Sequence, residues 1–396
     1  MTSLTDRLRF AFSSDRVSPL EPGMHSYLAP GTDPLNYRMH LRIEPGGEGL
    51  LILQASTVLH LNRSATEFAY HLLHRKSDAE TAKTISERYR VSEKQALNDY
   101  VEFKDRVLTL IETPDLDPVS YLELDRTTPY SEALGAPYRL DAALTYDLPK
   151  GSKIDAAPTK RVKRELDTKE WIQVLDKAWN AGIPHVVFTG GEPTLRADLP
   201  ELLEHAEDLG MVTGLLSDGI KLSDTKYLKR LLDAGLDHAM VVLQPDKKKT
   251  WDSLASFSYW KEVLADDVFI AAHLTITERN VAKANSYIDK LADSGVSAIS
   301  LSENSTKLSG ALQLARDHAD FIDLPLVWDL PVPYSDLNPV SLELEKADGE
   351  HPQGAGKAWL YVEPDGDVLP GQGINQKLGN FLKEDWEKIW GHAKGN

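Results

Sequence analysis

The stretch His185-Val186-Val187-Phe188-Thr189-Gly190-Gly191-Glu192-Pro193-Thr194-Leu195-Arg196 decides the fold. Its apolar first half predicts a buried strand, and His185 at its start is expected to be a packing residue. Gly190-Gly191 predicts a tight turn, and Pro193 fits the entry to a helix. A strand, a glycine turn with one carboxylate and a helix, in this order, are how many α/β proteins hold a small polar ligand at the end of a strand.

Residues 139–335 continue this strand–helix alternation on both sides of the quoted stretch. The expected strands are 140–146, 185–189, 212–217, 239–243, 269–275 and 297–301, with 326–330 as a further candidate. Such alternation predicts a parallel sheet with helices outside it. The fold class is therefore α/β, with a partial (β/α)6 barrel of the TIM type over residues 139–335. Ligands of such barrels lie at the carboxyl ends of the strands.

The rest of the chain follows other patterns. Residues 1–34 are rich in proline and glycine and predict an extended arm. Residues 35–112 predict a small antiparallel sheet followed by three helices, an α+β domain of the winged-helix type, with helix starts at Ser64, Ser77 and Ser92. Residues 113–138 predict a linker. Residues 336–396 break the alternation and carry a hairpin around Pro364-Asp365-Gly366.

Composition limits the possible functions. The net charge of −17 argues against nucleic acid as a partner. No apolar run approaches the roughly 20 residues that span a bilayer, and the N-terminus has no secretion signal, so a cytoplasmic protein without a membrane partner is expected. The chain has no cysteine, which excludes disulfides, thiolate metal sites and cysteine-ligated iron–sulfur clusters.

Thr189-Gly190-Gly191-Glu192-Pro193-Thr194 resembles the GGEP motif of the radical S-adenosylmethionine (SAM) enzymes. Leu216-Ser217-Asp218-Gly219 stands where that family usually has Thr-Asn-Gly. Further on, 361–368 and 378–380 are similar to the family's SPASM or twitch extension. Residues 35–112, with Val58-Leu59-His60-Leu61-Asn62, resemble PqqD-like peptide-recognition domains. The resemblance implies a peptide-modifying branch of the family, a peptide partner that adds a strand to the 35–112 sheet, and SAM as cofactor. The SAM-binding residues that it implies are Gly190, Gly191, Glu192, Pro193, Ser217, Asp218 and Gly219.

The same resemblance shows what is missing. Leu148, Ser152 and Asp155 stand where the family's three cluster cysteines would be, and Gly371 stands in place of a cysteine of the extension. Leucine cannot be a ligand, and serine and aspartate oxygens suit Mg²⁺ or Ca²⁺ better than iron and sulfide. We therefore expect no iron–sulfur cluster and assign no metal ligand. Val241-Val242-Leu243-Gln244-Pro245 also offers less polar chemistry than the family's fourth strand, so the sequence leaves SAM binding open.

Two further features have a functional and a purely structural interpretation. Basic residues in the loop that replaces the cluster motif could contact an anion or an acidic peptide, or simply be solvated. These residues are Lys150, Lys153, Lys160, Arg161, Lys163 and Arg164. His273, on the expected fifth strand, would be a pocket residue if it faced inward, where Ser300, Ser302 and Asn304 are also candidates.

Three hypotheses follow. The first is a cluster-less, peptide-binding pseudoenzyme or accessory protein of peptide modification. The second is an enzyme that uses the barrel pocket, with Glu192, His273 or a loop lysine, for non-radical chemistry on SAM or another small polar ligand. The third is a cysteine-free variant of a radical SAM peptide-modifying enzyme. No catalytic residue is assigned.

Overall fold

The structure is a computed structural model. It describes residues 17–30, 32–33, 37–54, 57–113, 116, 121–122, 134–153, 155–264, 268–327, 329–346 and 352–394. Most of the predicted linker 113–138 and the first half of the predicted arm 1–34 therefore lie outside the described residues. The chain divides into two compact units, residues 1–135 and 136–396, and each is described by itself. The narrower domain limits given above stay predictions.

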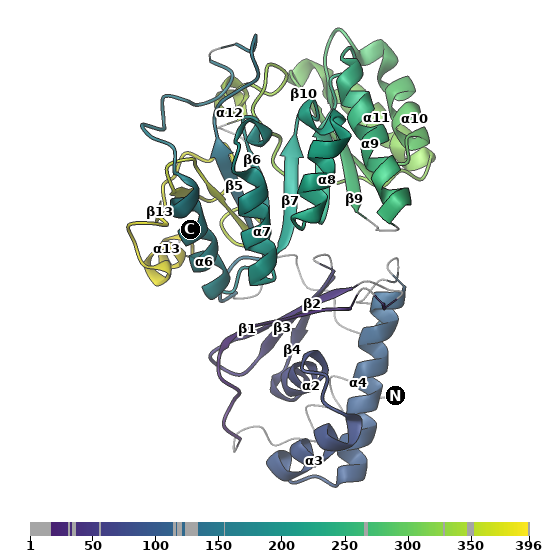
Figure 1. The fold of residues 1–396 in the computed structure, drawn as a ribbon, viewed down its shortest axis with the longest axis vertical. Helices are drawn as coiled ribbons and strands as arrows, with labels where there is room; N and C mark the ends of the chain where they lie inside the picture. Colours follow the sequence, from purple (N-terminus) through teal and green to yellow (C-terminus); the bar gives the residue numbers. More distant parts are fainter. Residues whose placement is uncertain are drawn as a thin grey trace. The chain divides into compact units, whose positions relative to one another are not determined.

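The first unit is an antiparallel sheet backed by three helices (Figure 1). The sheet has the order β1-β2-β3-β4, with β1 at Gly23–Leu28, β2 at Arg38–Ile43, β3 at Gly49–Leu53 and β4 at Thr57–Leu61. The helices are α2 (Arg63–Leu73), α3 (Asp78–Tyr89) and α4 (Glu93–Glu112). Strand β1 lies within the predicted arm, and it pairs with β2 over its whole length. This pairing joins segments separated in the chain, so local composition could not predict it.

Capping explains where these helices begin. Ser77 caps α3 in a full capping box with Glu80, and Ser92 caps α4, as predicted. The first helix differs, because Asn62 caps it and Glu67 instead accepts hydrogen bonds from Arg88 and Tyr89. The predicted start at Ser64 was therefore wrong by two residues.

The second unit contains a nine-stranded sheet of order β10-β9-β8-β7-β6-β5-β11-β12-β13. Strands β5 to β10 are parallel and adjacent in chain order. They are β5 (Arg139–Thr145), β6 (His185–Gly190), β7 (Val212–Ser217), β8 (His238–Val242), β9 (Phe269–Ile276) and β10 (Ala298–Glu303). The six predicted strands are thus all found, with ends shifted by no more than two residues. The predicted partial (β/α)6 architecture is confirmed.

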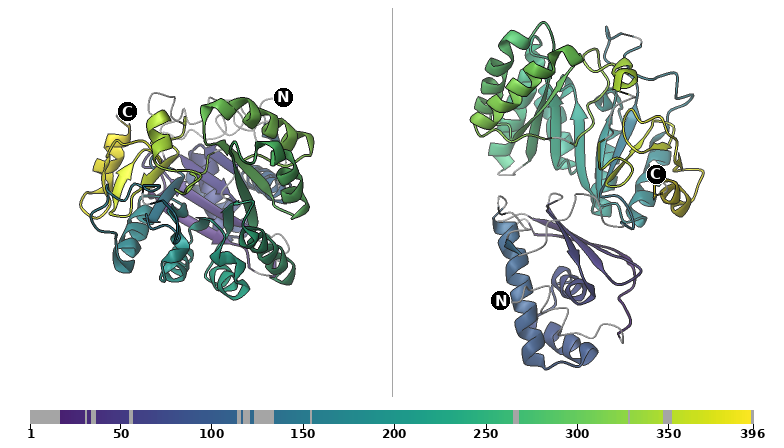
Figure 2. Two further views of the ribbon diagram at one scale, coloured as in Figure 1. Left: turned by 90° about the horizontal axis from the view of Figure 1, so that it is seen from above. Right: turned by 180° about the vertical axis from the view of Figure 1, so that it is seen from behind.

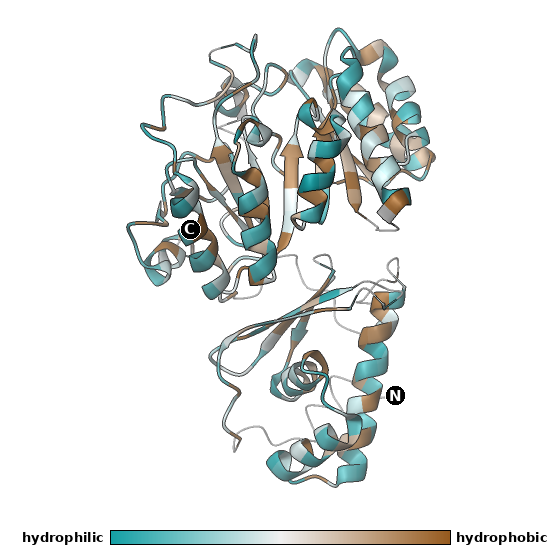
Figure 3. Cartoon of the chain, viewed as in Figure 1, coloured by the Kyte–Doolittle hydropathy of each residue, from teal (hydrophilic) through white to brown (hydrophobic). Residues whose placement is uncertain are grey.

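Helices follow these strands and lie along one side of the curved sheet (Figure 2, left). They are α6 (Thr168–Asn180), α7 (Leu199–Leu209), α8 (Thr225–Asp233), α9 (Lys248–Leu264), α10 (Ala284–Asp293) and α11 (Ser309–Phe321). Hydrophobic residues concentrate on the strands, while the outer faces of the helices are hydrophilic (Figure 3). On the other side of the sheet Val187, Leu216, Met240 and Ala271 form a buried cluster with Val327 and Leu330. The chain after α11 therefore packs against the inner face of the barrel.

The C-terminal residues continue the same sheet. Strand β11 (Trp359–Val362) pairs in parallel with β5, and β12 (Asp367–Leu369) and β13 (Gly379–Asn380) follow antiparallel. Helices α12 (Ser341–Lys346) and α13 (Trp386–Lys394) flank them. The candidate strand 326–330 is not found as such: its described residues contribute only an isolated bridge between Leu326 and Ile299. None of the described helices is long and apolar enough to cross a membrane.

Candidate functional site

The glycine pair after β6 packs against the end of β5. Gly190 has φ +125°, and a Cβ there would lie 2.3 Å from the carbonyl oxygen of Thr145. A Cβ on Gly191 would lie 2.3 Å from the carbonyl oxygen of Asp147. The amides of Gly191 and Glu192 donate to these same two oxygens at 2.7 and 2.9 Å. Both glycines are therefore required by backbone packing within the protein, because no side chain fits between the two strand ends.

The Glu192 carboxylate is buried and uses both oxygens inside the protein. Oε1 accepts hydrogen bonds from the amide of Thr194 at 3.0 Å, the hydroxyl of Thr194 at 2.6 Å and the hydroxyl of Ser217 at 2.8 Å. Oε2 accepts from the amide of Asp218 at 2.7 Å. Burial raises the pKa of Glu192 to about 7, and the negative charge of the neighbouring Asp218 is the second cause of this shift. This carboxylate thus joins the end of β6 to the end of β7.

Asp218 differs from Glu192 in that one of its carboxylate oxygens accepts no hydrogen bond from the described residues. Its Oδ1 accepts from the amide of Ile220 at 2.8 Å. Its Oδ2 is buried and has no hydrogen-bond partner among the described residues, and burial raises the pKa of Asp218. Gly219, with φ +74°, follows directly and donates to the hydroxyl of Ser217 at 3.1 Å. The structure therefore brings Glu192, Ser217, Asp218 and Gly219 together at one place, as the resemblance implied.

The cavity at these strand ends is small, at about 50 Å³. Glu192, Asp218, Gln244 and Lys247 line one part of it, and the segment 333–337 of the same chain lines another. The amide of Tyr334 donates to the carbonyl oxygen of Gly190 at 2.8 Å. Pockets for ligands of SAM's size usually measure about 300–1,000 Å³. In this conformation the cavity does not fit SAM, and we derive no step through that cofactor.

The three positions of the family's cluster motif are not arranged as ligands. Leu148 is half-buried and packs against an apolar cluster that contains Tyr146, Tyr334 and Tyr361. Ser152 lies in a turn closed by its amide and the carbonyl of Pro149, and Asp155 is exposed. Among the residues that the structure describes, no three histidines or carboxylates are grouped to hold a metal ion. The residues present therefore do not fit the cluster that the family motif holds.

A polar network beside this apolar cluster was missed by sequence reasoning. The hydroxyl of Tyr146 donates to Glu363 at 2.9 Å, and Tyr334 donates to Glu343. Arg161 contacts Glu343 at 2.6 Å. These residues come from the loop after β5 and from the C-terminal segment, so no local motif could have indicated them. The network fixes the loop after β5 to the C-terminal part of the second unit.

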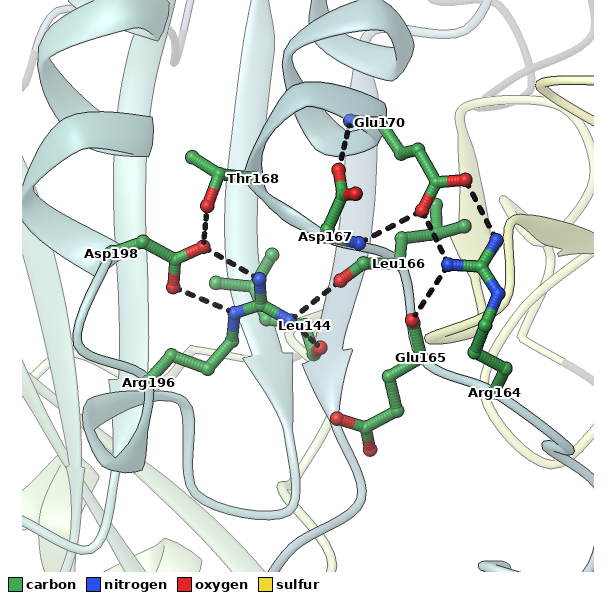
Figure 4. A network of polar contacts seen from close by, with 9 residues as sticks. All are labelled: Leu144, Arg164, Glu165, Leu166, Asp167, Thr168, Glu170, Arg196 and Asp198. Atoms are coloured by element: carbon green, nitrogen blue, oxygen red, sulfur yellow. Dashed lines mark hydrogen bonds and ion pairs between the residues drawn. The ribbon is translucent and has the colours of Figure 1, made fainter.

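Arg196, the last residue of the quoted stretch, has a structural role (Figure 4). Its guanidinium binds both oxygens of Asp198 at 2.9 and 2.6 Å. It also donates to the carbonyl oxygens of Leu144 at 3.1 Å and Leu166 at 3.0 Å. Asp198 in turn accepts from the hydroxyl of Thr168 at 2.7 Å. Arg196 thereby ties the chain that follows the glycine turn to the end of β5 and the start of α6.

The basic loop is only partly available to a ligand. Arg161 is bound to Glu343, and Arg164 binds both oxygens of Glu170 at 2.7 Å. The remaining members are exposed: Lys150, Lys153, Lys160 and Lys163. An anion contact would therefore depend on these four lysines alone.

The two strand histidines differ in their surroundings. His273 is buried on the same strand face as Ala271, and it contacts the hydroxyls of Ser300 at 2.9 Å and Ser302 at 3.0 Å. It thus faces the barrel interior, held by hydroxyls. His185 packs as predicted, and its Nε2 also lies 2.7 Å from Nε2 of His238. That pair lies at the amino ends of β6 and β8, away from the glycine turn.

Residues 148–265 match the model described as "Radical SAM superfamily". The PqqA peptide cyclase of Methylocella silvestris is 37% identical over 123 residues, which are 31% of this chain and 33% of that protein. The enzyme of the same name from Bradyrhizobium diazoefficiens is 35% identical over 138 residues, 34% of this chain and 36% of that protein. The matched stretch thus spans about a third of each relative's length.

Solved structures extend the likeness to the fold. The crystal structure of Streptococcus suis SuiB bound to S-adenosylmethionine matches with a TM-score of 0.56 and 16% identity. The match covers 92% of this chain and 88% of the SuiB chain. SuiB bound to the precursor peptide SuiA matches with a TM-score of 0.56 and 15% identity. At such identity the likeness concerns the fold alone. In its fold, and over residues 148–265, this cysteine-free chain is similar to the radical SAM superfamily, as its GGEP-like turn predicted.

Proposed function

We propose that this protein is a cytoplasmic, cluster-free relative of the radical SAM enzymes that binds a peptide and assists peptide modification without radical chemistry. The observation that carries the proposal is the position of Leu148. Where the family places its first cluster ligand, this side chain packs against the cluster that contains Tyr146 and Tyr334. An apolar contact replaces a metal ligand there, and no residue of the chain can supply a thiolate.

The peptide-binding part of the proposal rests on the first unit and on the relatives. Two matched relatives are named PqqA peptide cyclase, and SuiB was crystallised with a precursor peptide. The four-stranded sheet has β1 and β4 at its edges. A peptide strand that adds to a sheet edge gains main-chain hydrogen bonds, and neighbouring side-chain pockets give it specificity. We assign the peptide to one of these edges.

Anaerobic reconstitution tests the cluster part. Purified protein is incubated with iron, sulfide and reductant, desalted, and assayed for iron, sulfide and visible charge-transfer absorbance. We expect no bound cluster and no cleavage of SAM to 5′-deoxyadenosine. A stoichiometric cluster together with SAM cleavage would sink the proposal.

Peptide capture tests the other part. The full chain is used as bait for a short peptide encoded near its gene, and affinity is measured by fluorescence anisotropy. Val58→Pro removes an amide from β4 and Ser26→Pro removes one from β1, since proline has no backbone N–H. We expect one of the two variants to lose at least tenfold in affinity while the other changes little. If both folded variants bound the peptide as tightly as the wild type does, addition of the peptide at a strand edge would be contradicted.

A second candidate is supported by one observation at the strand ends. Burial brings the pKa of Glu192 to about 7, which suits a general acid or base near neutral pH. Asp218 beside it lines the cavity, and its buried Oδ2 has no hydrogen-bond partner among the described residues. This favours acid–base chemistry on a small polar ligand. Calorimetry with SAM and its analogues, repeated on Glu192→Gln, checks it: absence of binding heat with all of them argues for the first candidate.

A further inference from the structure

A larger cavity, which we call the extension pocket, lies in the second unit apart from the glycine turn. Its volume is about 260 Å³. It is bounded by parts of residues 329–343, by β5 and β11, and by turns at 352–355 and 371–374. Tyr334 lines both this pocket and the small cavity at the strand ends. Gly371, which stands in place of a cysteine of the family's extension, belongs to the lining, whereas none of the predicted SAM-binding residues does.

The wall of the extension pocket combines apolar side chains with polar ones. Trp359, Leu330, Leu342 and Ile374 contribute side chains, together with several prolines. The indole of Trp359 is nearly buried, and a Cβ on Gly354 would lie 2.0 Å from its ring. The guanidinium of Arg139 lies 5.1 Å from the centroid of the same ring. This indole is therefore held in place before any ligand arrives, which lowers the entropy lost on binding.

The charge of the lining has one sign. Among the residues that the structure describes, Asp141, Asp329 and Glu343 line the pocket, and no lysine, arginine or histidine does. Arg139 holds Asp141 at 2.7 Å and Arg161 holds Glu343 at 2.6 Å, and neither arginine belongs to the lining. The two arginines fix Asp141 and Glu343 in position and offset their charge, so Asp329 is the exposed carboxylate of the lining. A concave surface lined by one sign of charge concentrates ligands of the opposite sign.

We infer that the extension pocket binds a compact aromatic or branched apolar group that carries a protonated amine. The apolar body packs against Trp359, and the ammonium group faces Asp329. At roughly 30 Å³ for each water displaced, the volume corresponds to about nine water molecules, which suits a single-ring amine. This inference holds whether or not the first unit binds a peptide, since it depends on the second unit alone.

The experiment compares three probes of one shape on the full chain by calorimetry and ligand-observed NMR. They are 2-phenylethylamine, the neutral 2-phenylethanol and the anionic phenylacetate. We expect the amine to bind at least tenfold more tightly than the acid, with the alcohol between them. No binding of any probe, or equal binding of the acid, overturns the inference.

Two variants locate the binding and two control for them. Ala355→Leu adds volume inside the pocket and should abolish binding of the amine, whereas Asp329→Asn should weaken it about three- to tenfold. Ala311→Leu and Asp320→Asn make the same changes on α11, away from the pocket lining, and should leave affinity unchanged. If Ala355→Leu fails to fold, Asp329→Asn and Asp320→Asn still decide, because Asp329 and Asp320 are both exposed. Equal affinity in all folded variants would place the amine elsewhere and refute the assignment.

Discussion

Two neighbouring regions at the same end of the sheet differ in how closely they keep the family pattern. The turn 189–193 keeps its glycines, its carboxylate and its proline, while the loop 147–157 has lost every residue of the cluster motif. The turn is constrained by the protein itself, since Gly190 and Gly191 pack against backbone oxygens and Glu192 joins two strands. The loop contributes apolar contacts from Leu148 and Ala157, whereas Ser152 closes a turn and Asp155 faces solvent. The residues of the turn are therefore required by the fold itself, whatever ligand the site holds.

The largest effect expected from this comparison concerns two glycines with positive φ. Gly190→Ala should destabilise the second unit by about 3 kcal/mol or more, because the new Cβ would overlap the carbonyl oxygen of Thr145. Gly151→Ala, in the loop 147–157, should lower the free energy of unfolding by only about 1 kcal/mol. Its φ is +95°, which disfavours a side chain, but nothing lies within 4 Å of the added Cβ. Urea unfolding monitored by tryptophan fluorescence measures both. Equal losses would show that the turn is no more constrained than the loop.

The next effect concerns the Glu192 carboxyl. Its folded-state pKa of about 7 lies above the ordinary value of 4.5, so the folded state binds the extra proton between these pH values. The stabilisation from this group is full below pH 4.5 and is lost as the pH rises through about 7, with an amplitude on the order of 2 kcal/mol. Glu192→Gln should remove this slope.

The test is the difference in unfolding free energy between the wild type and Glu192→Gln, measured at several pH values from 4.5 to 8. Taking the difference cancels other titrating groups. A flat difference across this range would mean that Glu192 ionises normally in the folded state.

An effect of similar size and opposite sign is expected at the other end of the barrel. Burial, with some contribution from Arg139, lowers the pKa of His238 from 6.5 to about 4, and His185 lies against it. Stability from this group is present above pH 6.5 and is lost as the pH falls toward 4, by an amount on the order of 1–2 kcal/mol. His238→Gln should flatten that acid limb in chemical unfolding curves. An unchanged acid limb in this variant would assign the loss to other groups.

The smallest effect is expected within the replaced loop. Leu148→Ala should destabilise the second unit by about 1 kcal/mol, because a half-buried leucine loses part of its apolar contact. Asp155→Ala should lie within about 0.5 kcal/mol of the wild type, since Asp155 is exposed. Urea unfolding of these two variants and of Gly190→Ala gives three losses in the free energy of unfolding. Their order shows how much less stability the positions of the cluster motif contribute than the glycine turn does. A loss at Asp155 as large as that at Leu148 would indicate a role for this carboxylate that its exposure does not predict.

The sequence by itself determined the fold class and most of the strands of the second unit. Strand and helix periods are local, and a buried strand such as Val212–Ser217 is visible in six consecutive residues. The absence of cysteine was likewise a property of the sequence alone. The residues that meet at the strand ends, Glu192 with Ser217 and Asp218, could be anticipated because adjacent parallel strands end at the same edge.

Only the tertiary structure decided what these residues do. Contacts between distant segments bind both oxygens of Glu192 within the protein and place segment 333–337 in the lining of the cavity. Such contacts also pair β1 with β2 and β11 with β5. The extension pocket is of the same kind, because its aromatic wall and its carboxylates come from separate parts of the second unit. Such contacts produce no periodic pattern or local motif in the sequence. The reason is that packing depends on the shape and charge of side chains that lie far apart along the chain.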